Sequence, residues 1–200
     1  MQLIVATRNA HKTREIQQIL GQDFAVSDLS AHPEIPKIRE TGKSFGENAI
    51  LKAVAASRHL PGLIIADDSG LEVDALAGAP GIFSARYAAE NATDKQNIDK
   101  LLVELDRIGA EKNKRSARFR CVIALARRGE LLGTFEGIVE GEIGERARGL
   151  HGFGYDPIFV PRGFEATFAQ LPAVVKNKIS HRAKAIRALS RKLAALKLTD

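Results

Sequence analysis

The sequence is poor in cysteine and contains no long apolar run. Its 200 residues include one cysteine, Cys121, which excludes an intrachain disulfide framework and a zinc site built from cysteines. No apolar stretch approaches the roughly 20 residues that cross a bilayer, and the N-terminus has no signal-peptide pattern. We therefore expect a cytoplasmic protein without a membrane partner. Because Cys121 lies in an apolar run, we expect its thiol to be buried and structural.

The sequence also lacks internal repeats and any linker rich in Ser, Pro or Gly, which excludes a solenoid and gives no clear domain boundary. Its composition, 44% hydrophobic and 27% charged, is that of an ordinary globular protein. The chain is long enough for one domain or one compact two-lobed unit, so we treat residues 1–200 as a single domain. The formal net charge of +6 suggests an anionic partner.

The order of apolar runs and helix-capping signals predicts an α/β protein. Strands are expected at residues 3–6, 63–66, 118–126, 131–143 and 157–160, and helices after Asn9, Ser44, Thr93 and Ser180. Residues 28–43 are predicted to be loop with at most a short strand, because prolines and charges interrupt them. Strands and helices alternate early and a hairpin follows later, which favours a mixed sheet flanked by helices.

Two adjacent carboxylates, Asp67 and Asp68, follow the second predicted strand. Ligands of open α/β sheets bind beyond the carboxyl ends of strands, and Gly70 would allow a tight turn there. Carboxylate oxygens suit a hard cation such as Mg²⁺, and Glu40 could supply one more. Glu47 is the competing carboxylate, although its capping position explains it without a metal. The alternative for the acidic pair is a solvated turn.

Cations occur in several predicted loops. Residues 6–12 join a strand to a helix, so backbone N–H groups and the helix N-terminus would face an anion. Thr7 and Asn9 could donate hydrogen bonds there, and Lys12 could place its charge on a phosphate. This segment has no glycines and is not a Walker A loop, so Lys12 could also be an ordinary surface lysine. Arg86 and Lys176 are further candidates.

Residues 152–157 (GFGYDP) place an aromatic ring between two glycines. Phe153 could then stack on a flat base and Asp156 could accept from its edge, although a turn with a core-facing ring is equally compatible. His181 and Arg182 begin the last helix, where cations oppose the helix dipole unless an anion compensates them. Together, the carboxylates, cations and aromatic ring indicate a nucleoside triphosphate site.

Six ordered motifs carry a family resemblance. They are residues 6–12 (ATRNAHK), 40–49 (ETGKSFGENA), 66–71 (ADDSGL), 78–87 (GAPGIFSARY), 152–157 (GFGYDP) and 176–182 (KNKISHR). Over essentially the whole chain, the sequence resembles the inosine/xanthosine triphosphate pyrophosphatase family. The resemblance implies hydrolysis of deaminated purine nucleoside triphosphates to monophosphate and pyrophosphate. It also implies dependence on Mg²⁺, a homodimer, and two lobes with the active site in the cleft between them.

The resemblance also assigns residues. Asp68 would be the catalytic carboxylate and, with Glu40, a metal ligand. Because Arg39 stands where many relatives carry a second acidic residue, Glu47 stays open as the outer ligand. The residues expected to bind substrate are Thr7, Arg8, Asn9, Ala10, His11, Lys12, Ser69, Arg86, Phe153, Gly154, Tyr155, Asp156, Lys176, His181 and Arg182.

Two other functions are compatible with part of these features. A nucleic-acid-binding module would explain the basic charge, but the sequence shows no helix-turn-helix, RNA-recognition or zinc-finger signature. We therefore expect no nucleic-acid partner. A pyrophosphatase that acts on pyrimidine or modified nucleotides could share the same fold and metal chemistry.

Overall fold

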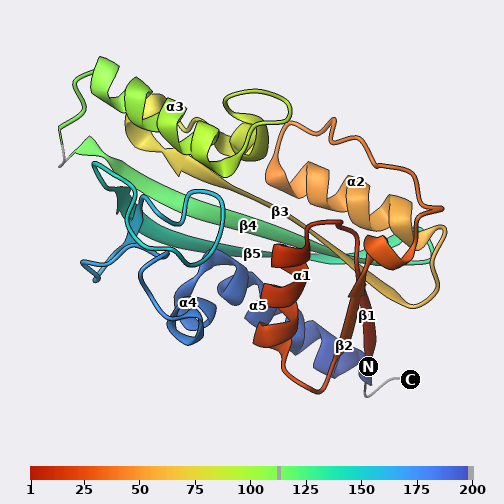
Figure 1. Ribbon diagram of the computed structural model, residues 1–200. Coiled ribbons are helices and arrows are strands. Elements are labelled where there is room, and N and C mark those ends of the chain that lie inside the picture. The colour runs from red at the N-terminus through yellow and green to blue at the C-terminus, as the bar shows by residue number, and fades with distance from the viewer. Residues whose placement is uncertain (112–113, 198–200) are drawn as a thin grey trace. The chain divides into compact units, whose positions relative to one another are not determined.

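The computed structural model describes residues 1–111 and 114–197. In these residues, six strands form one mixed sheet with the order β2-β1-β3-β4-β5-β6 (Figure 1). The strands are β1 (Gln2–Val5), β2 (Ala25–Asp28), β3 (Leu63–Val73), β4 (Ser116–Arg127), β5 (Glu130–Ile143) and β6 (Phe159–Pro161). The α-helices are α1 (Ala10–Leu20), α2 (Phe45–Ser57), α3 (Asp94–Arg107), α4 (Ala173–Ile179) and α5 (His181–Lys197). Short 3₁₀ helices are η1 (Leu29–Ala31), η2 (Asp74–Leu76) and η3 (Gly81–Arg86).

The pairing of the strands confirms the expected mixed α/β sheet. β1 pairs in parallel with both β2 and β3, and β5 pairs antiparallel with β6. β4 and β5 are neighbours joined at Arg128 and Gly129, whose φ values of 53° and 82° are both left-handed. Two such residues form the tight turn of a β-hairpin, so the predicted hairpin is confirmed.

The chain divides into two compact units. Unit 1 comprises Met1–Asp68, Cys121–Gly137 and the C-terminal segment from His181. In this unit, α1 and α5 lie on one face of the sheet and α2 lies on the other (Figure 1). The core on the α1–α5 face includes Leu3, Val5, Ile16, Leu63, Ile65, Cys121, Ile123, Leu125, Ile186, Leu189 and Leu193. Cys121 is fully buried there, as expected.

Unit 2 comprises Ser69–Arg120 and Ile138–Ser180. Its core joins α3 to the parts of β3, β4 and β5 that belong to this unit, and includes Leu71, Val73, Ile98, Leu101, Leu105, Phe119, Val139, Phe159 and Phe168. Phe119, Phe159 and Phe168 form an aromatic cluster, with ring centroids 4.7–6.1 Å apart. The capping box predicted at Thr93 and Gln96 is present at the start of α3.

Three features differ from the sequence predictions. α4 was not predicted, and β2 begins before the segment expected to contain a short strand. The expected turn at residues 67–70 is wrong, because these residues continue β3. The parallel neighbour β1 ends at Val5, opposite Ile65, so β3 extends beyond it. Residues 67–70 therefore follow the end of the β1 pairing without any turn in the chain. Among the described helices, none is long and apolar enough to cross a membrane.

Candidate functional site

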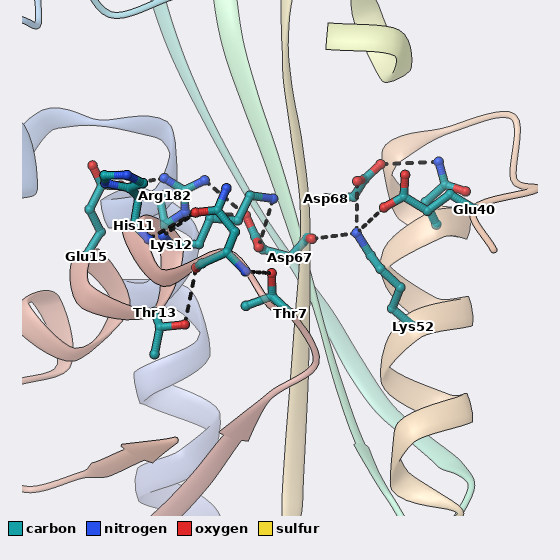
Figure 2. Close-up of polar contacts among 12 residues, drawn as sticks. Thr7, His11, Lys12, Thr13, Glu15, Glu40, Lys52, Asp67, Asp68 and Arg182 are labelled. Carbon is teal, nitrogen blue, oxygen red and sulfur yellow. Dashed lines mark hydrogen bonds and ion pairs between the residues drawn. The ribbon is translucent and has the colours of Figure 1, made fainter. Parts of the chain in front are cut away.

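Asp67 and Asp68 point to opposite faces of the sheet. Successive side chains of a strand alternate between its two faces, and both residues lie within β3. Figure 2 shows Asp68 directed toward α2 and Asp67 directed toward α1 and α5. The two adjacent carboxylates therefore cannot act together on one cation, as their sequence adjacency had suggested. Each belongs to a separate polar cluster of unit 1.

The first cluster surrounds Asp68. Lys52 Nζ, from α2, lies 3.0 Å from Asp68 Oδ1 and 2.8 Å from Glu40 Oε1, and also donates to the Asp67 carbonyl at 2.8 Å. Asn48, one helical turn before Lys52, donates from Nδ2 to Asp68 Oδ2 at 3.3 Å. The spacing of four residues places both side chains on the same face of α2, toward Asp68. Lys52 thus joins two carboxylates around one ammonium group (Figure 2).

The loop before α2 fixes Asn48. The Gly42 amide donates to Asn48 Oδ1 at 2.8 Å, which leaves the Asn48 NH₂ group directed at Asp68. Gly42 has no room for a side chain, because a Cβ would lie 2.7 Å from Asn48 Oδ1 and 2.9 Å from its backbone nitrogen. The close contact between this loop and α2 therefore requires glycine.

The N-terminus of α2 also determines what Glu47 does. Ser44 caps the helix, because its hydroxyl accepts from the Glu47 amide at 3.2 Å. The Glu47 carboxylate accepts from the Lys43 amide at 2.7 Å, one residue earlier than a regular capping box. Glu47 is thereby held at the helix end, whereas Glu40 shares Lys52 with Asp68.

The charges around Asp68 are strongly coupled. Burial raises the pKa of Asp68, Lys52 and Lys12 oppose that rise, and the negative charge of Glu40 adds to it. Burial also opposes the charge of Lys52, but Asp68, Glu40 and Asp67 outweigh burial and raise the pKa of Lys52 above its usual value. The cluster therefore combines a permanent ammonium group with a carboxylate that accepts a proton more readily than an exposed aspartate.

The carboxylates at Lys52 fit a hard divalent cation. No group of three or more His, Cys, Asp or Glu side chains converges anywhere in the described part of the chain. Asp68 and Glu40 are nevertheless close enough to share one ammonium group, so their oxygens supply two hard ligands. Mg²⁺ is commonly bound by one or two carboxylates, with water and substrate phosphates completing the shell. The donor set matches that pattern.

The second cluster surrounds Asp67. Its Oδ1 lies 3.1 Å from Lys12 Nζ, and its Oδ2 accepts from Arg182 Nη2 at 3.0 Å. Arg182, which is only 2% exposed, also donates from Nη1 to Glu15 Oε2 at 2.5 Å. These acids raise the pKa of Arg182 despite its burial. Asp67 thereby links the phosphate-binding candidate Lys12 to the first turn of α5.

The segment from Thr7 to Lys12 forms the N-terminal cap of α1. Asn9 Oδ1 accepts from the amides of His11 and Lys12 at 3.0 and 3.3 Å, and Thr7 Oγ1 accepts from the Asn9 amide at 3.1 Å. The helix then begins at Ala10. A helix N-terminus with an adjacent lysine is suited to phosphate, because the helix dipole and the lysine charge favour an anion.

The aromatic loop of residues 152–156 lies in unit 2. Asp156 Oδ2 accepts from the Phe153 amide at 2.9 Å and from Lys176 Nζ at 2.5 Å, and Lys176 Nζ lies 5.0 Å from the centroid of the Phe153 ring. Gly152 adopts φ 77°, and a Cβ there would lie 2.0 Å from Asp156 Oδ2. Asp156 and Lys176 are buried, while Phe153 is partly exposed. Lys176 thus supports the ring from within unit 2.

The remaining candidate residues have simple placements. Arg8 donates to the Ile35 carbonyl at 2.6 Å, and Arg86 lies 5.4 Å from the Phe83 ring centroid. Ser69 follows Asp68 within β3 and is partly buried. His181 and Ser180 are buried at the start of α5. Unit 1 therefore contains the candidates of the first and second motifs together with Asp68, whereas Ser69, Lys176 and the 152–156 loop belong to unit 2.

Lys52 and Asn48 are not among the site residues predicted from the sequence. Both lie in a helix whose sequence is mostly apolar. One signal was available: the two polar residues are spaced by four within an alanine-rich helix whose Ala49, Ala53 and Ala56 are fully buried. Polar side chains near such a buried face require partners, because an unpaired buried charge is costly.

These features define an α/β protein with a carboxylate–lysine cluster at Asp68 of β3, just beyond the pairing of β3 with the parallel strand β1. The chain belongs to the Ham1 family, whose model matches residues 3–192. It is 48% identical over 193 residues to the dITP/XTP pyrophosphatase of Bacillus subtilis (strain 168), which covers 96% of each chain. It is 49% identical over 197 residues to the dITP/XTP pyrophosphatase of Methylococcus capsulatus, covering 97% of this chain and 96% of the relative. The family resemblance inferred from the six motifs is thereby confirmed.

A solved structure agrees. The Ham1 protein of Coxiella burnetii matches with a TM-score of 0.86 at 41% identity, and the match covers 98% of this chain and 99% of that one. The fold class expected from the sequence is therefore the fold of the family.

Proposed function

We propose that this protein hydrolyses non-standard purine nucleoside triphosphates, ITP or dITP and XTP or dXTP, to the monophosphate and pyrophosphate. It would thereby remove deaminated purines from the nucleotide pool. The observation that carries the proposal is the cluster in which Lys52 joins Asp68 to Glu40, in a chain whose relatives are named dITP/XTP pyrophosphatase. Hydrolysis of a phosphoanhydride bond depends on placing charged groups where charge develops in the transition state, and this cluster supplies such groups.

The triphosphate would bind at the start of α1. The Lys12 ammonium group would supply positive charge to its oxygens, and the dipole of α1 favours an anion at this end of the helix. Thr7 and Asn9 keep this turn in place through their side-chain hydrogen bonds. Lys12 is already paired with Asp67, so it is held in position before substrate arrives. Lys176 was expected to bind triphosphate as well, but its contacts with Asp156 and Phe153 support a role at the base loop.

Asp68 would take the proton from the water that attacks the α-phosphorus. Its raised pKa makes it a better proton acceptor than an exposed aspartate, while Asn48 and Lys52 hold both of its oxygens. Asp68 and Glu40 would hold Mg²⁺, which neutralises charge on the phosphates when bound. Glu40 fits this role better than Glu47, since Glu47 is occupied at the N-terminus of α2.

Selectivity would depend on the substituent at C6 of the purine. Hypoxanthine and xanthine carry a carbonyl acceptor there, which His181 or Arg182 could satisfy as a donor. Adenine presents an amino group instead, and facing donors would cost about 1–3 kcal/mol for each unpaired group. Phe153 would stack on the base, with Asp156 at its edge. The location of the whole site in a cleft between two lobes stays a prediction.

The decisive experiment compares pyrophosphate release from dITP, XTP, dUTP, dATP and dGTP with Mg²⁺ present. We expect rapid release from dITP and XTP and slow release from the other three. Preferential hydrolysis of dUTP would favour a pyrimidine nucleotide pyrophosphatase. Salt-sensitive binding to duplex DNA without hydrolysis would favour a nucleic-acid-binding module.

A variant tests the assignment of Asp68. Asp68→Asn should abolish dITP hydrolysis while the far-UV circular dichroism spectrum stays unchanged. Asp99→Asn, on the exposed side of α3, is the matched control and should keep full activity. Near wild-type turnover by Asp68→Asn would show that Asp68 is not the base. The homodimer, the cytoplasmic location and the absence of a nucleic-acid partner stay predictions, which sedimentation, fractionation and binding measurements test.

A further inference from the structure

Two hydrogen bonds join the loop of residues 152–156 to segments that lie much earlier in the chain. The Gly154 amide donates to Asp94 Oδ2 at 2.7 Å, and the Tyr155 hydroxyl donates to the Ser84 carbonyl at 2.9 Å. Both partners come from segments much earlier in the chain, and all four residues belong to unit 2. The loop that presents Phe153 is therefore attached at the two residues that follow Phe153.

Asp94 is well supported for this purpose. It is the first residue of α3, which begins with the Thr93 capping box. Ile98, Leu101 and Leu105 bury the inner face of α3 in the core of unit 2. The backbone of Asp94 is thereby held by a packed helix. A loop that is hydrogen-bonded to the Asp94 carboxylate is held in place by the same helix.

The other partner of the loop is equally well fixed. The Ser84 hydroxyl accepts from the Leu71 amide of β3 at 2.9 Å and donates to the Gly81 carbonyl at 2.6 Å. The Ser84 carbonyl that receives the Tyr155 hydroxyl is thus tied to the sheet. Tyr155 itself is only 4% exposed, so its hydroxyl lies in the interior of unit 2.

The backbone of Gly154 explains how its amide reaches Asp94. Gly154 adopts φ 60°, in the left-handed region, although a Cβ there would meet nothing within 4 Å. Glycine is therefore needed for the conformation and not for space. In that conformation the Gly154 amide faces Asp94, and the preceding Phe153 ring stands over Lys176.

We propose that Asp94 and the Tyr155 hydroxyl are positioning residues, which hold the 152–156 loop in the conformation that binds the purine base. This inference rests on the proposed function and adds to it a residue outside all six motifs. Asp94 also has a simpler role, because a carboxylate at a helix N-terminus stabilises the helix. The two roles predict different behaviour for an asparagine at this position, which retains an acceptor oxygen but loses the charge.

The first test is the steady-state hydrolysis of dITP by Asp94→Ala, Asp94→Asn and Asp99→Ala. Asp99 is the matched control, since it lies on the same helix and pairs with Lys95. We expect Asp94→Ala to raise KM roughly fivefold to tenfold while kcat changes by less than about twofold. Asp94→Asn should keep a nearly normal KM, because its Oδ1 still accepts from Gly154. Tyr155→Phe should raise KM in the same manner as Asp94→Ala.

The second test is a double-mutant cycle. In a Phe153→Ala background, Asp94→Ala should cause no further rise in KM, since the anchored ring is already absent. If the two substitutions raise KM independently, so that their effects multiply, the inference is overturned. It is also overturned if Asp94→Ala has the same KM as Asp99→Ala. An equal rise in KM for Asp94→Asn and Asp94→Ala would show that Asp94 acts through helix stability alone.

Hydrogen exchange separates this inference from the proposed function. Asp94→Ala should accelerate exchange of the Gly154 amide by several-fold relative to Asp99→Ala, whether or not the protein hydrolyses dITP. Unchanged exchange would show that Asp94 does not anchor the loop. If wild-type protein releases no pyrophosphate from dITP, the proposed function fails, and faster exchange alone would leave Asp94 as an anchor without a role in base binding.

Discussion

Replacing Arg182 with methionine removes the central cation of the Asp67 cluster. The guanidinium group is 2% exposed and donates to Asp67 Oδ2 from two nitrogens, at 3.0 and 3.3 Å, and to Glu15 at 2.5 Å. Without it, Asp67 loses this buried ion pair and keeps the one with the partly exposed Lys12. Removal of one partner from a buried ion pair costs about 3–5 kcal/mol. We therefore expect the free energy of unfolding to fall by about that amount.

Urea denaturation and thermal unfolding measure this loss. For a chain of this size, each kcal/mol lowers Tm by about 2–4 °C, so Arg182→Met should melt about 6–20 °C below the wild type. Arg191→Met, which changes an exposed arginine of the same helix, is the control and should cost at most about 0.5 kcal/mol. Equal stability of the two variants would refute the view that Arg182 is the structural centre of this cluster.

The same residue also tests base recognition. If Arg182 reads the purine, Arg182→Lys should lose discrimination between dITP and dATP more than it loses dATP turnover. Lysine keeps the charge near Asp67 but lacks the planar fork that donates to two acceptors at once. Equal losses on both substrates would assign Arg182 to the support of Asp67 and Lys12 alone.

Three further predictions concern the Asp68 side of the sheet. Gly42→Ala should destabilise the protein by about 1–3 kcal/mol in urea denaturation, since the new Cβ would meet Asn48 Oδ1 at 2.7 Å; an unchanged midpoint would contradict this. Burial opposes the charge of Lys52, but the nearby carboxylates outweigh burial and raise the pKa of Lys52 in the folded state. The stability difference between wild type and Lys52→Met should therefore be constant from neutral pH to about the pKa of an exposed lysine, and should shift against the wild type above it. A difference that stays constant to higher pH would refute the raised value. Glu40→Gln should increase the Mg²⁺ concentration for half-maximal activity, whereas Glu47→Gln should chiefly lower the stability of α2; the reverse pattern would make Glu47 the metal ligand.

Local signals predicted most of the secondary structure. Asn9, Ser44 and Thr93 each cap a helix where the sequence places a cap, because capping depends on a side chain and amides only two or three residues away. The hairpin turn at Arg128 and Gly129 is equally local. The turn predicted at residues 67–70 is wrong because that prediction also rests on local signals. The polar residues and Gly70 predict that the strand ends there, but β3 continues to Val73 within the sheet, and a local pattern contains no information about neighbouring strands.

The sequence predicts that Asp67 and Asp68 share one cation, because adjacent carboxylates are expected to lie close together. Alternation along β3 separates them, and their partners come from α1, α2 and α5, which no short-range pattern connects to β3. Lys52 was missed for this reason: its importance depends on the strand it faces, and not on its own neighbours in the chain.

The cations at the start of α5 show how an apparent conflict in the sequence can be resolved within the protein. Arg182 stands at the positive end of a helix, and this unfavourable placement indicated an anionic ligand. The structure provides two anions from the chain itself, Asp67 and Glu15, at 3.0 and 2.5 Å. The dipole conflict alone therefore gives no evidence for a ligand at Arg182. The case for a phosphate ligand rests instead on the N-terminus of α1, where the helix dipole favours an anion and Lys12 lies beside the same Asp67.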